Sequence, residues 1–383
     1  MTSHRLFPAL LHNELEKIWA HRGKALIIAF IIIVFGGSFI AYKNYHGMQQ
    51  SYQSSVSFAK TQVIQDQHQL AHLQGSQRRA MQVQLRAARS ILKQAERNSF
   101  FSTNVAQQIA SFQKSLKSTP ARFQGVTREQ LAMDHYRIHH GITQYHPSAR
   151  GGYRLVGQVF AGSTMVLLAL IALGISADRV SSEMESGTWG GLLLHAPRRR
   201  PVYLAKLAAS LIATWSFMAA VAVGFFVTAG LLLGFGNPNN PHVVGIKLVV
   251  ASQSSGTSVL TPVQPFHLIP QWSYDLLALG LAMLSIGALV CIFIALSMVT
   301  RSTVFSLIVG AILILSGVLA RVAGSVSVID PAVHLPLMAD WTRLLAMQYN
   351  VAAWSLKTGL IVILGWAALS IGFSVWYARK LDL

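Results

Sequence analysis

The sequence is poor in cysteine and in charged residues. It has one cysteine, Cys291, within an apolar stretch, so a disulfide framework and a cysteine-based metal or redox motif are excluded. Only 11% of the residues are charged, whereas about a quarter are charged in soluble domains. Hydrophobic residues make up 52% of the chain, and the mean hydropathy is +0.45. This composition predicts an integral membrane protein, which we expect to be all-α.

Motifs for nucleotide or hydrolytic chemistry are also missing. The chain has no GxxxxGK[ST] loop to hold phosphates and no GxSxG nucleophile turn. Its predicted helices show no HExxH or paired-carboxylate spacing that would favour a metal site. We therefore expect no catalytic, cofactor-binding or metal-binding residues in this chain, and any ATPase must be another polypeptide.

Six uncharged stretches are long enough to cross a bilayer. A helix rises about 1.5 Å per residue and needs roughly 20 residues to cross about 30 Å of hydrocarbon. The predicted spans are residues 25–42, 155–177, 207–235, 276–299, 303–320 and 356–377. No small-residue cleavage site accompanies the first stretch, so we expect a retained anchor and not a signal peptide.

The distribution of Lys and Arg over the short loops predicts the orientation. With the N-terminus inside, twelve of these residues are cytoplasmic and four lie in short outer loops. The protein is thus expected in the plasma membrane as a multi-pass protein with both termini cytoplasmic. Residues 43–154 are then extracytoplasmic, and the shorter outer loops are residues 236–275 and 321–355.

Residues 43–154 form a strongly basic segment. They hold fifteen Lys/Arg and four acids, and so supply +11 of the formal net charge of +18. A basic patch is one mark of nucleic-acid binding, but outside a cell anionic lipid headgroups or cell-wall polymer are better partners. A merely solvated surface is an equal alternative, and we expect no nucleic acid.

The pattern of this segment is helical. Apolar residues recur three and four positions apart, which places them on one helix face. The three stripes begin at Ala59, Met81 and Val105, with turns at Gly75 and Pro120. A short fourth helix is predicted to begin at Thr127, with Gln130 completing a capping box. The segment is therefore predicted to be a helical domain of three or four helices.

Two charged elements lie on the predicted cytoplasmic side. Residues 1–24 are expected to form an amphipathic interfacial helix, with Leu11, Leu15, Ile18 and Trp19 on one face. It is either a simple anchor or a surface that also contacts a cytoplasmic partner. The loop 178–206 has acids before bases, which suits a short helix because it complements the helix dipole. Such a loop is often only topogenic, but Trp189 and the leucines 192–194 need a covering partner or the bilayer surface.

These features resemble the permease, or membrane subunit, of the type-2 ABC exporters. The resemblance rests on the entry helix, the six spans, the closing residues 377–382 and the pattern of the 178–206 loop. In that loop the matching residues are Glu183, Glu185, Gly187, Thr188, Leu192, Leu193, Leu194, Pro197, Arg200 and Lys206. The resemblance covers nearly the whole chain except residues 43–154.

The resemblance implies a pump driven from outside the lipid. It assigns residues 183–194 to a coupling helix that docks on a separate cytoplasmic ATP-binding subunit, supported by the entry helix near Glu14 and Trp19. ATP and Mg would be bound by that partner and not by this chain. It further implies pairing with a second permease copy or a related permease, within membrane lipids. The residues of the substrate path are unknown, and the short segments near residues 335–345 resemble the helices that cap the outer end of such permeases.

Two other classes remain open. An ion-coupled secondary transporter or channel usually has ionisable residues deep in its spans, and none of the six spans has one near its midplane. The serines and threonines in the spans more often join helices by hydrogen bonds than line a path. A membrane-anchored binding or sensor protein would instead use the basic segment. For Trp341 and Trp354, anchoring in the aromatic belt is an alternative to an outer gate.

Overall fold

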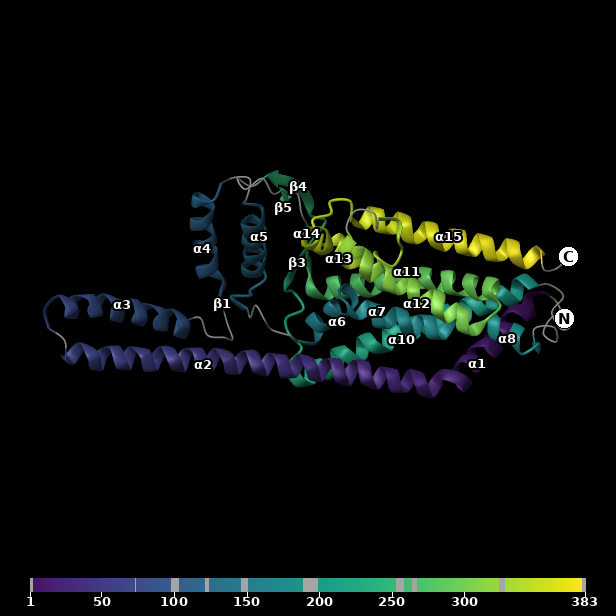
Figure 1. The fold of residues 1–383 in the computed structure, drawn as a ribbon, viewed down its shortest axis with the longest axis horizontal. Helices are drawn as coiled ribbons and strands as arrows, with labels where there is room; N and C mark the ends of the chain where they lie inside the picture. The colour runs from purple at the N-terminus through teal and green to yellow at the C-terminus, as the bar shows by residue number, and fades with distance from the viewer. Residues whose placement is uncertain are drawn as a thin grey trace.

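The computed structural model describes residues 3–72, 74–97, 103–120, 124–145, 151–188, 199–252, 258–263, 267–323 and 328–380. It is 81% helical with no closed sheet, which confirms the all-α class. Figure 1 shows a helical bundle from which the N-terminal helix extends far beyond one end. Both chain termini and α8 (Ser181–Glu185) lie at the opposite end of the bundle.

Six helices of the described chain are long and apolar enough to cross a membrane, as predicted. The first is one continuous helix made of α1 (Ser3–Ile31), the π-helical turn η1 (Ile32–Gly36) and α2 (Gly37–His72). The entry helix and the first span are therefore not separated at residue 24. Figure 1 shows α1 at an angle to α2, and a π-turn is a known cause of such a change of direction.

The second predicted span, residues 155–177, is interrupted in the structure. It consists of α6 (Gly152–Ala161) and α7 (Thr164–Ser176), separated at Gly162, whose backbone is extended. The sequence Gly162-Ser163-Thr164 explains the break, because these residues are weak helix formers and serine favours helix starts. The remaining spans are α10 (Arg199–Leu233), α11 (Gln271–Thr300), α12 (Thr303–Ala323) and α15 (Leu356–Lys380).

Helix α11 is the centre of the bundle. In the most apolar 18-residue part of α11, 67% is buried, compared with 22% in the same part of α12 and of α15 and 17% in that of the first span. Its side chains form the main core with those of α6, α7 and α10. The outer helices keep apolar side chains on their exposed faces, as a helix surrounded by lipid does.

The described part of residues 43–154 is mostly helical, as predicted, although Thr103–Asn104 and Gln144–Tyr145 pair as two short strands. Helix α2 pairs with α3 (Gly75–Arg97), and Val63 and Leu85 are buried there, as their stripes predicted. The turn at Gly75 requires a positive φ of 66°, which glycine adopts without strain. Asn104 caps α4 (Val105–Ser118) by accepting hydrogen bonds from Ala106 N and Gln107 N.

The predicted capping box at Thr127 is wrong. Helix α5 (Gly125–His139) begins two residues earlier, after Gln124, and no side chain caps its start. Thr127 lies inside the helix, because the backbone hydrogen bond from Arg128 N to Gln124 O already closes the first turn. The capping pattern is present in the sequence, but the helix begins before Thr127.

Small antiparallel sheets lie beside α4 and α5 and at the end of the bundle that faces them, together with two short helices. The antiparallel pairs are β1 (Thr103–Asn104) with β2 (Gln144–Tyr145), β3 (Pro241–Val244) with β6 (His267–Pro270), and β4 (Lys247–Ser252) with β5 (Ser258–Val263). Strands β3, β4, β5 and β6 all lie in the loop 236–275. Helices α13 (Leu337–Trp341) and α14 (Leu344–Gln348) confirm short helices before the last span.

Trp354 does not belong to an aromatic belt. Its side chain is fully buried, and it packs in a cluster with Val333 and Leu345.

Hydroxyl groups within the spans form hydrogen bonds to other segments. Ser285 Oγ donates a hydrogen bond to Leu335 O (2.7 Å) and Ser316 Oγ donates to Asp330 Oδ2 (2.9 Å). Both bonds join a span to the segment between α12 and α13, whereas the predicted kind of bond between two helices occurs where the hydroxyls of Ser38 and Thr228 lie 2.8 Å apart.

Candidate functional site

The predicted coupling elements meet in a cluster of four charged residues. Lys206 Nζ lies 3.0 Å from Glu14 Oε1 and 2.8 Å from Glu183 Oε1. Lys17 Nζ contacts the same two oxygens at 3.1 and 3.0 Å. We call Glu14, Lys17, Glu183 and Lys206 the ion cluster. It has two ammonium groups and two carboxylates, so its formal charges cancel.

Burial makes this pairing necessary. The Lys206 side chain is fully buried, and that of Glu14 is only 4% exposed. An unpaired charge at such a site costs several kcal/mol, so each group depends on its partners. Lys206 does not reach toward water from the inner end of its span. It is the eighth residue of α10, and carboxylates from two other elements surround it.

A second ion pair lies beside the ion cluster. Arg22 Nη2 of α1 donates to Asp178 Oδ2, which lies between α7 and α8. The side chains of both residues are mostly buried, with 24% and 18% exposed. The neighbouring Arg179 donates from Nε to Ile175 O at 2.8 Å, at the end of α7. The segment that leads from α7 into α8 is thus tied to the entry helix at more than one point.

Helix α8 is also held from the opposite side by α11 and α12. Ser297 Oγ accepts hydrogen bonds from Val180 N (3.1 Å) and Ser181 N (2.9 Å), the free amides at the start of α8. Glu185 Oε1 accepts from Thr303 N (2.9 Å) at the start of α12, where a carboxylate also suits the helix dipole. This five-residue helix is therefore connected to four membrane-spanning helices.

The chain turns sharply after α8. Gly187 has a φ of 72°, which ends the helix without strain. The Thr188 hydroxyl lies 2.9 Å from Ser186 Oγ, and the side chains of residues 185–188 are exposed. The predicted coupling residues Leu192, Leu193 and Leu194 lie outside the described residues. The described part thus ends with an exposed turn that leads into them.

The predicted site residues divide into three groups. Glu14 and Glu183 meet in the ion cluster, whereas Glu185, Gly187 and Thr188 form the exposed end of α8. Trp19 lies apart from both groups, with 65% of its surface exposed. Sequence reasoning missed the partners Lys17, Arg22, Ser297 and Thr303. For Lys206 a signal existed, because a lone lysine within an apolar helix needs a buried counter-charge.

A family model described as ABC-2 family transporter protein matches residues 9–376. The chain belongs to this family. It is therefore an ABC transporter permease, a multi-pass membrane protein as the resemblance indicated. The match includes α1, α8 and residues 43–154 in one continuous range. No curated protein and no solved structure matches the chain.

Membership of the ABC-2 family assigns the general role of this subunit. Permeases of this family are in general non-enzymatic membrane components that work with an ATP-binding subunit. The absence of a phosphate loop from the sequence agrees with this division of labour. Among the described residues, no group of three or more His, Cys, Asp or Glu side chains is arranged to hold a metal ion.

Proposed function

We propose that this ABC-2 permease forms the transmembrane path of an ATP-driven exporter and couples through α8 to a separate ATP-binding subunit. The observation that supports this most directly is the ion cluster, in which Glu183 of α8 shares two lysines with the entry helix and α10. A displacement of α8 would have to move those helices or break a buried ion pair. The cluster is thus suited to transmit force from the loop to the spans.

The exposed end of α8, next to the ion cluster, is suited to contact a partner that would exert this force. Glu185, Gly187 and Thr188 are exposed at the end of α8, and the apolar residues 189 and 192–194 follow in the sequence. We infer that this stretch docks on the partner, which binds ATP and Mg. The proposed role of Glu14 is to fix Lys206, because its own side chain is buried and faces the cluster.

The proposed orientation puts α8 and both termini in the cytoplasm of a cell whose plasma membrane the spans cross. In Figure 1 these features share one end of the bundle, whereas α3, α4 and α5 lie toward the other. Together with the Lys/Arg distribution this supports an extracytoplasmic position for residues 43–154. We further propose that two permeases, identical or related, pair to enclose the path.

The proposal can be tested by isolating the tagged full chain from the membranes of the cell that makes it. The preparation is photolabelled with azido-ATP in the presence of Mg. The expected result is a labelled polypeptide that co-purifies with the chain but is distinct from it. Combining Glu185→Lys with Leu193→Asp should reduce its yield about tenfold, since a misplaced charge in an apolar contact costs more than 1.4 kcal/mol.

The matched control is Asp66→Asn, which changes a carboxylate on α2 far from α8. Its yield of labelled partner should equal that of the unchanged chain. The coupling proposal fails if no separate nucleotide-binding polypeptide accompanies the unchanged chain. It also fails if the double variant of the loop retains the partner as well as the control does.

A further inference from the structure

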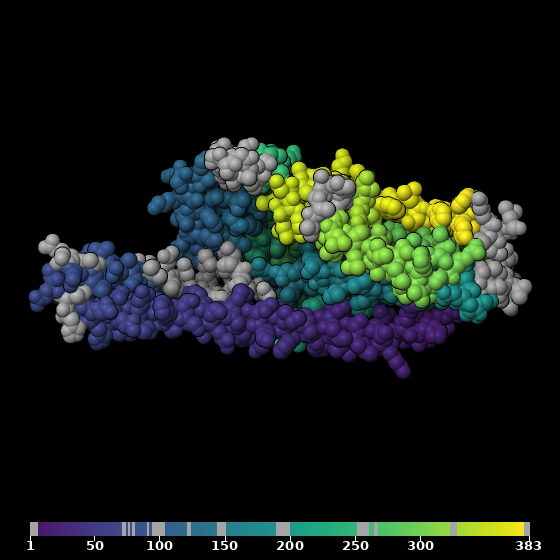
Figure 2. Space-filling view, viewed as in Figure 1, coloured from purple at the N-terminus to yellow at the C-terminus, as the bar shows by residue number. Residues whose placement is uncertain are grey.

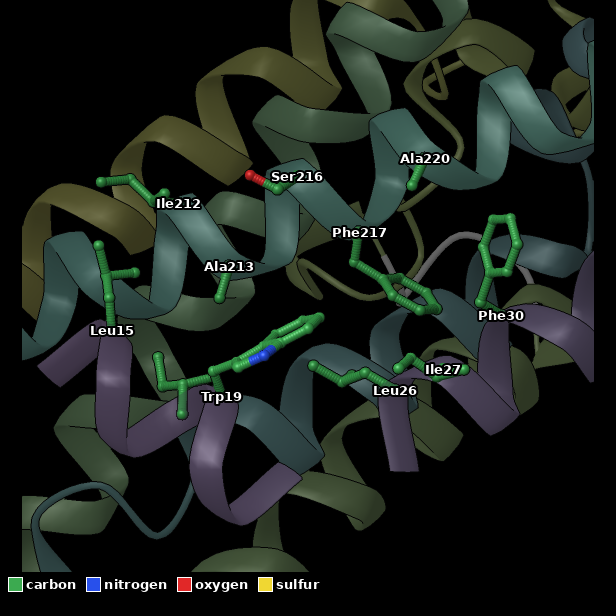
Figure 3. A pocket seen from close by; sticks show the side chains of 11 residues that line it. Leu15, Trp19, Leu26, Ile27, Phe30, Ile212, Ala213, Ser216, Phe217 and Ala220 are labelled. Carbon is green, nitrogen blue, oxygen red and sulfur yellow. The ribbon is translucent and has the colours of Figure 1, made fainter. Parts of the chain in front are cut away.

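A groove lies between the entry helix and α10, on a different side of α1 from the ion cluster. It encloses a cavity of about 420 Å³, within the range of small-ligand sites. Figure 3 shows the side chains of Trp19, Leu26 and Phe217 directed into the space between the two helices. Except for the Ser216 hydroxyl and the Trp19 indole N–H, its lining side chains are hydrocarbon.

Small side chains on one face of α10 create this recess. Ala213, Ser216 and Ala220 follow the three-and-four spacing of a helix face, and their short side chains leave the floor open. On α1, Gly23 makes room for the indole of Trp19, since a Cβ there would lie 3.2 Å from Trp19 Cδ2. The indole can therefore lie along its own helix and form a wall of the groove.

The groove is longer than one leaflet is thick, and it has a polar end. From Leu15 to Phe30 it extends along α1 for about 22 Å, compared with about 15 Å for half of the hydrocarbon core. Beyond Leu15 and Trp19 it continues into a second hollow, which His12 and Glu16 line. His12 Nδ1 lies 3.6 Å from Glu16 Oε1, and the two side chains are 74% and 70% exposed.

We propose that this groove binds a phosphatidylethanolamine molecule from the leaflet at the α8 end of the bundle. One acyl chain fills the recess between α1 and α10. The headgroup lies at the mouth, with its phosphate toward His12 and its ammonium toward Glu16. The Glu16 carboxylate can accept hydrogen bonds from the ammonium of this headgroup, and an imidazole N–H can donate to a phosphate oxygen, whereas choline has no N–H donor.

The position of the site gives the lipid an effect on α1. Leu15 lines the groove one residue from Glu14, whose carboxylate belongs to the ion cluster. Figure 2 shows α1 and α2 as one continuous strip along the side of the molecule, so α1 is accessible from the surrounding lipid. A bound acyl chain would add packing between α1 and α10 beside the ion cluster that already joins them. This inference rests on the membrane position of the spans and not on coupling to an ATPase.

The test uses the purified full chain in nanodiscs that contain phosphatidylethanolamine with a diazirine on its acyl chain. After illumination, peptides from α1 and α10 should carry most of the label. Ala220→Leu should lower this labelling about tenfold, because the added methylene groups occupy the place of the chain. Ser216→Leu should do the same, and Ala368→Leu on an exposed face of α15 should leave it unchanged.

The headgroup is tested with phosphatidylcholine and phosphatidylglycerol that carry the same diazirine chain. Phosphatidylethanolamine should label the groove about tenfold better than either, and Glu16→Gln should abolish the difference. Equal labelling by the three lipids overturns the headgroup assignment. Label spread evenly over the exposed spans, or equal labelling of the Ala220 and Ala368 variants, overturns the site. Cross-linking of this face to a second copy of the chain would also overturn it.

Discussion

The ammonium of Lys206 and the carboxylate of Glu183 lie 2.8 Å apart, in an ion pair that closes a loop of 23 residues. Glu14 and Lys17 of the first helix complete the same cluster. The loop between the second and third spans is therefore not an isolated surface element. It shares buried charges with the first span, and the two must move together or separate at a large energetic cost.

The first prediction concerns this pair. Glu183→Gln should destabilise the protein by about 3 kcal/mol, because it leaves two ammonium groups with one carboxylate in a buried place. Adding Lys206→Met should recover part of that loss, with a coupling energy of about 0.5–3 kcal/mol. Thermal unfolding in detergent of the unchanged protein, the two single variants and the double variant measures both the loss of stability and the coupling energy. Simple additivity of the two single substitutions would contradict the coupling of these residues.

A charge exchange tests the second pair. Arg22→Asp and Asp178→Arg should each weaken the connection between the entry helix and the α7–α8 segment by about 1 kcal/mol, since both side chains keep some exposure. The double exchange should restore stability, because the opposite charges again face each other. Thermal midpoints of the two single variants and of the exchange measure this. No recovery in the exchange would show that the pair does not hold these elements together.

The sequence predicted the helices better than it predicted which residues contact one another. Six spans and the mainly helical 43–154 segment followed from apolar length and periodicity, whereas the short helices near residue 340 followed from the family resemblance. These are local properties, because hydrophobic spacing decides which residues share a helix face. The break at Gly162 was also local, but a rule based on uncharged length ignores helix propensity. The second span was therefore drawn as one helix.

The partners of charged and aromatic residues could not be read in the same way. Lys206 was placed at a membrane edge, and the aromatic belt was one alternative for Trp354, yet both are buried. Both predictions used the position of a residue along its own span, whereas the outcome depends on what another segment brings to that position. Glu14 lies 192 residues from Lys206 in the sequence, so a single sequence offers no spacing that links them.

The third prediction concerns the start of α8. Ser297→Ala removes the acceptor for Val180 N and Ser181 N, both of which are buried. A lost helix cap costs about 1–2 kcal/mol, so hydrogen exchange of the first α8 amides should accelerate roughly 5–30-fold. Ser316→Ala is the control, because it removes a hydrogen bond to Asp330 without touching α8. Equal exchange rates in the two variants would mean that Ser297 does not cap this helix.

Two glycines in spanning helices should respond in opposite ways to alanine. At Gly317 of α12 an added Cβ would collide with the backbone of Ala332, so Gly317→Ala should destabilise the protein by about 1–3 kcal/mol. At Gly365 of α15 nothing lies within 4 Å, and Gly365→Ala should stabilise the helix by up to about 1 kcal/mol. The thermal unfolding midpoints of the two variants and of the unchanged protein measure these two effects. Destabilisation by both would show that α15 is covered in the assembled protein.

The last prediction is a dependence of stability on pH that arises outside the spans. His334 Nδ1 lies 2.7 Å from Asp340 Oδ2, and both side chains are fully buried. Burial by itself lowers the pKa of His334, but the hydrogen bond and the charge of Asp340 outweigh it and raise that pKa above 6.5. The folded state thus binds the His334 proton more tightly than the unfolded chain does. The stabilisation is complete below pH 6.5 and is lost as the pH rises through the folded pKa.

This sign can be checked by thermal unfolding in detergent between pH 5 and 9. The unchanged protein should lose stability toward the alkaline end of that range. Asp340→Asn removes the charge that holds the His334 proton, so its stability should be lower at pH 6 and should change less as the pH rises. His46→Ala removes a histidine of α2 that is not a hydrogen-bond partner of this pair, so it should keep the slope of the unchanged protein. A slope that Asp340→Asn leaves intact would assign the pH dependence to other groups.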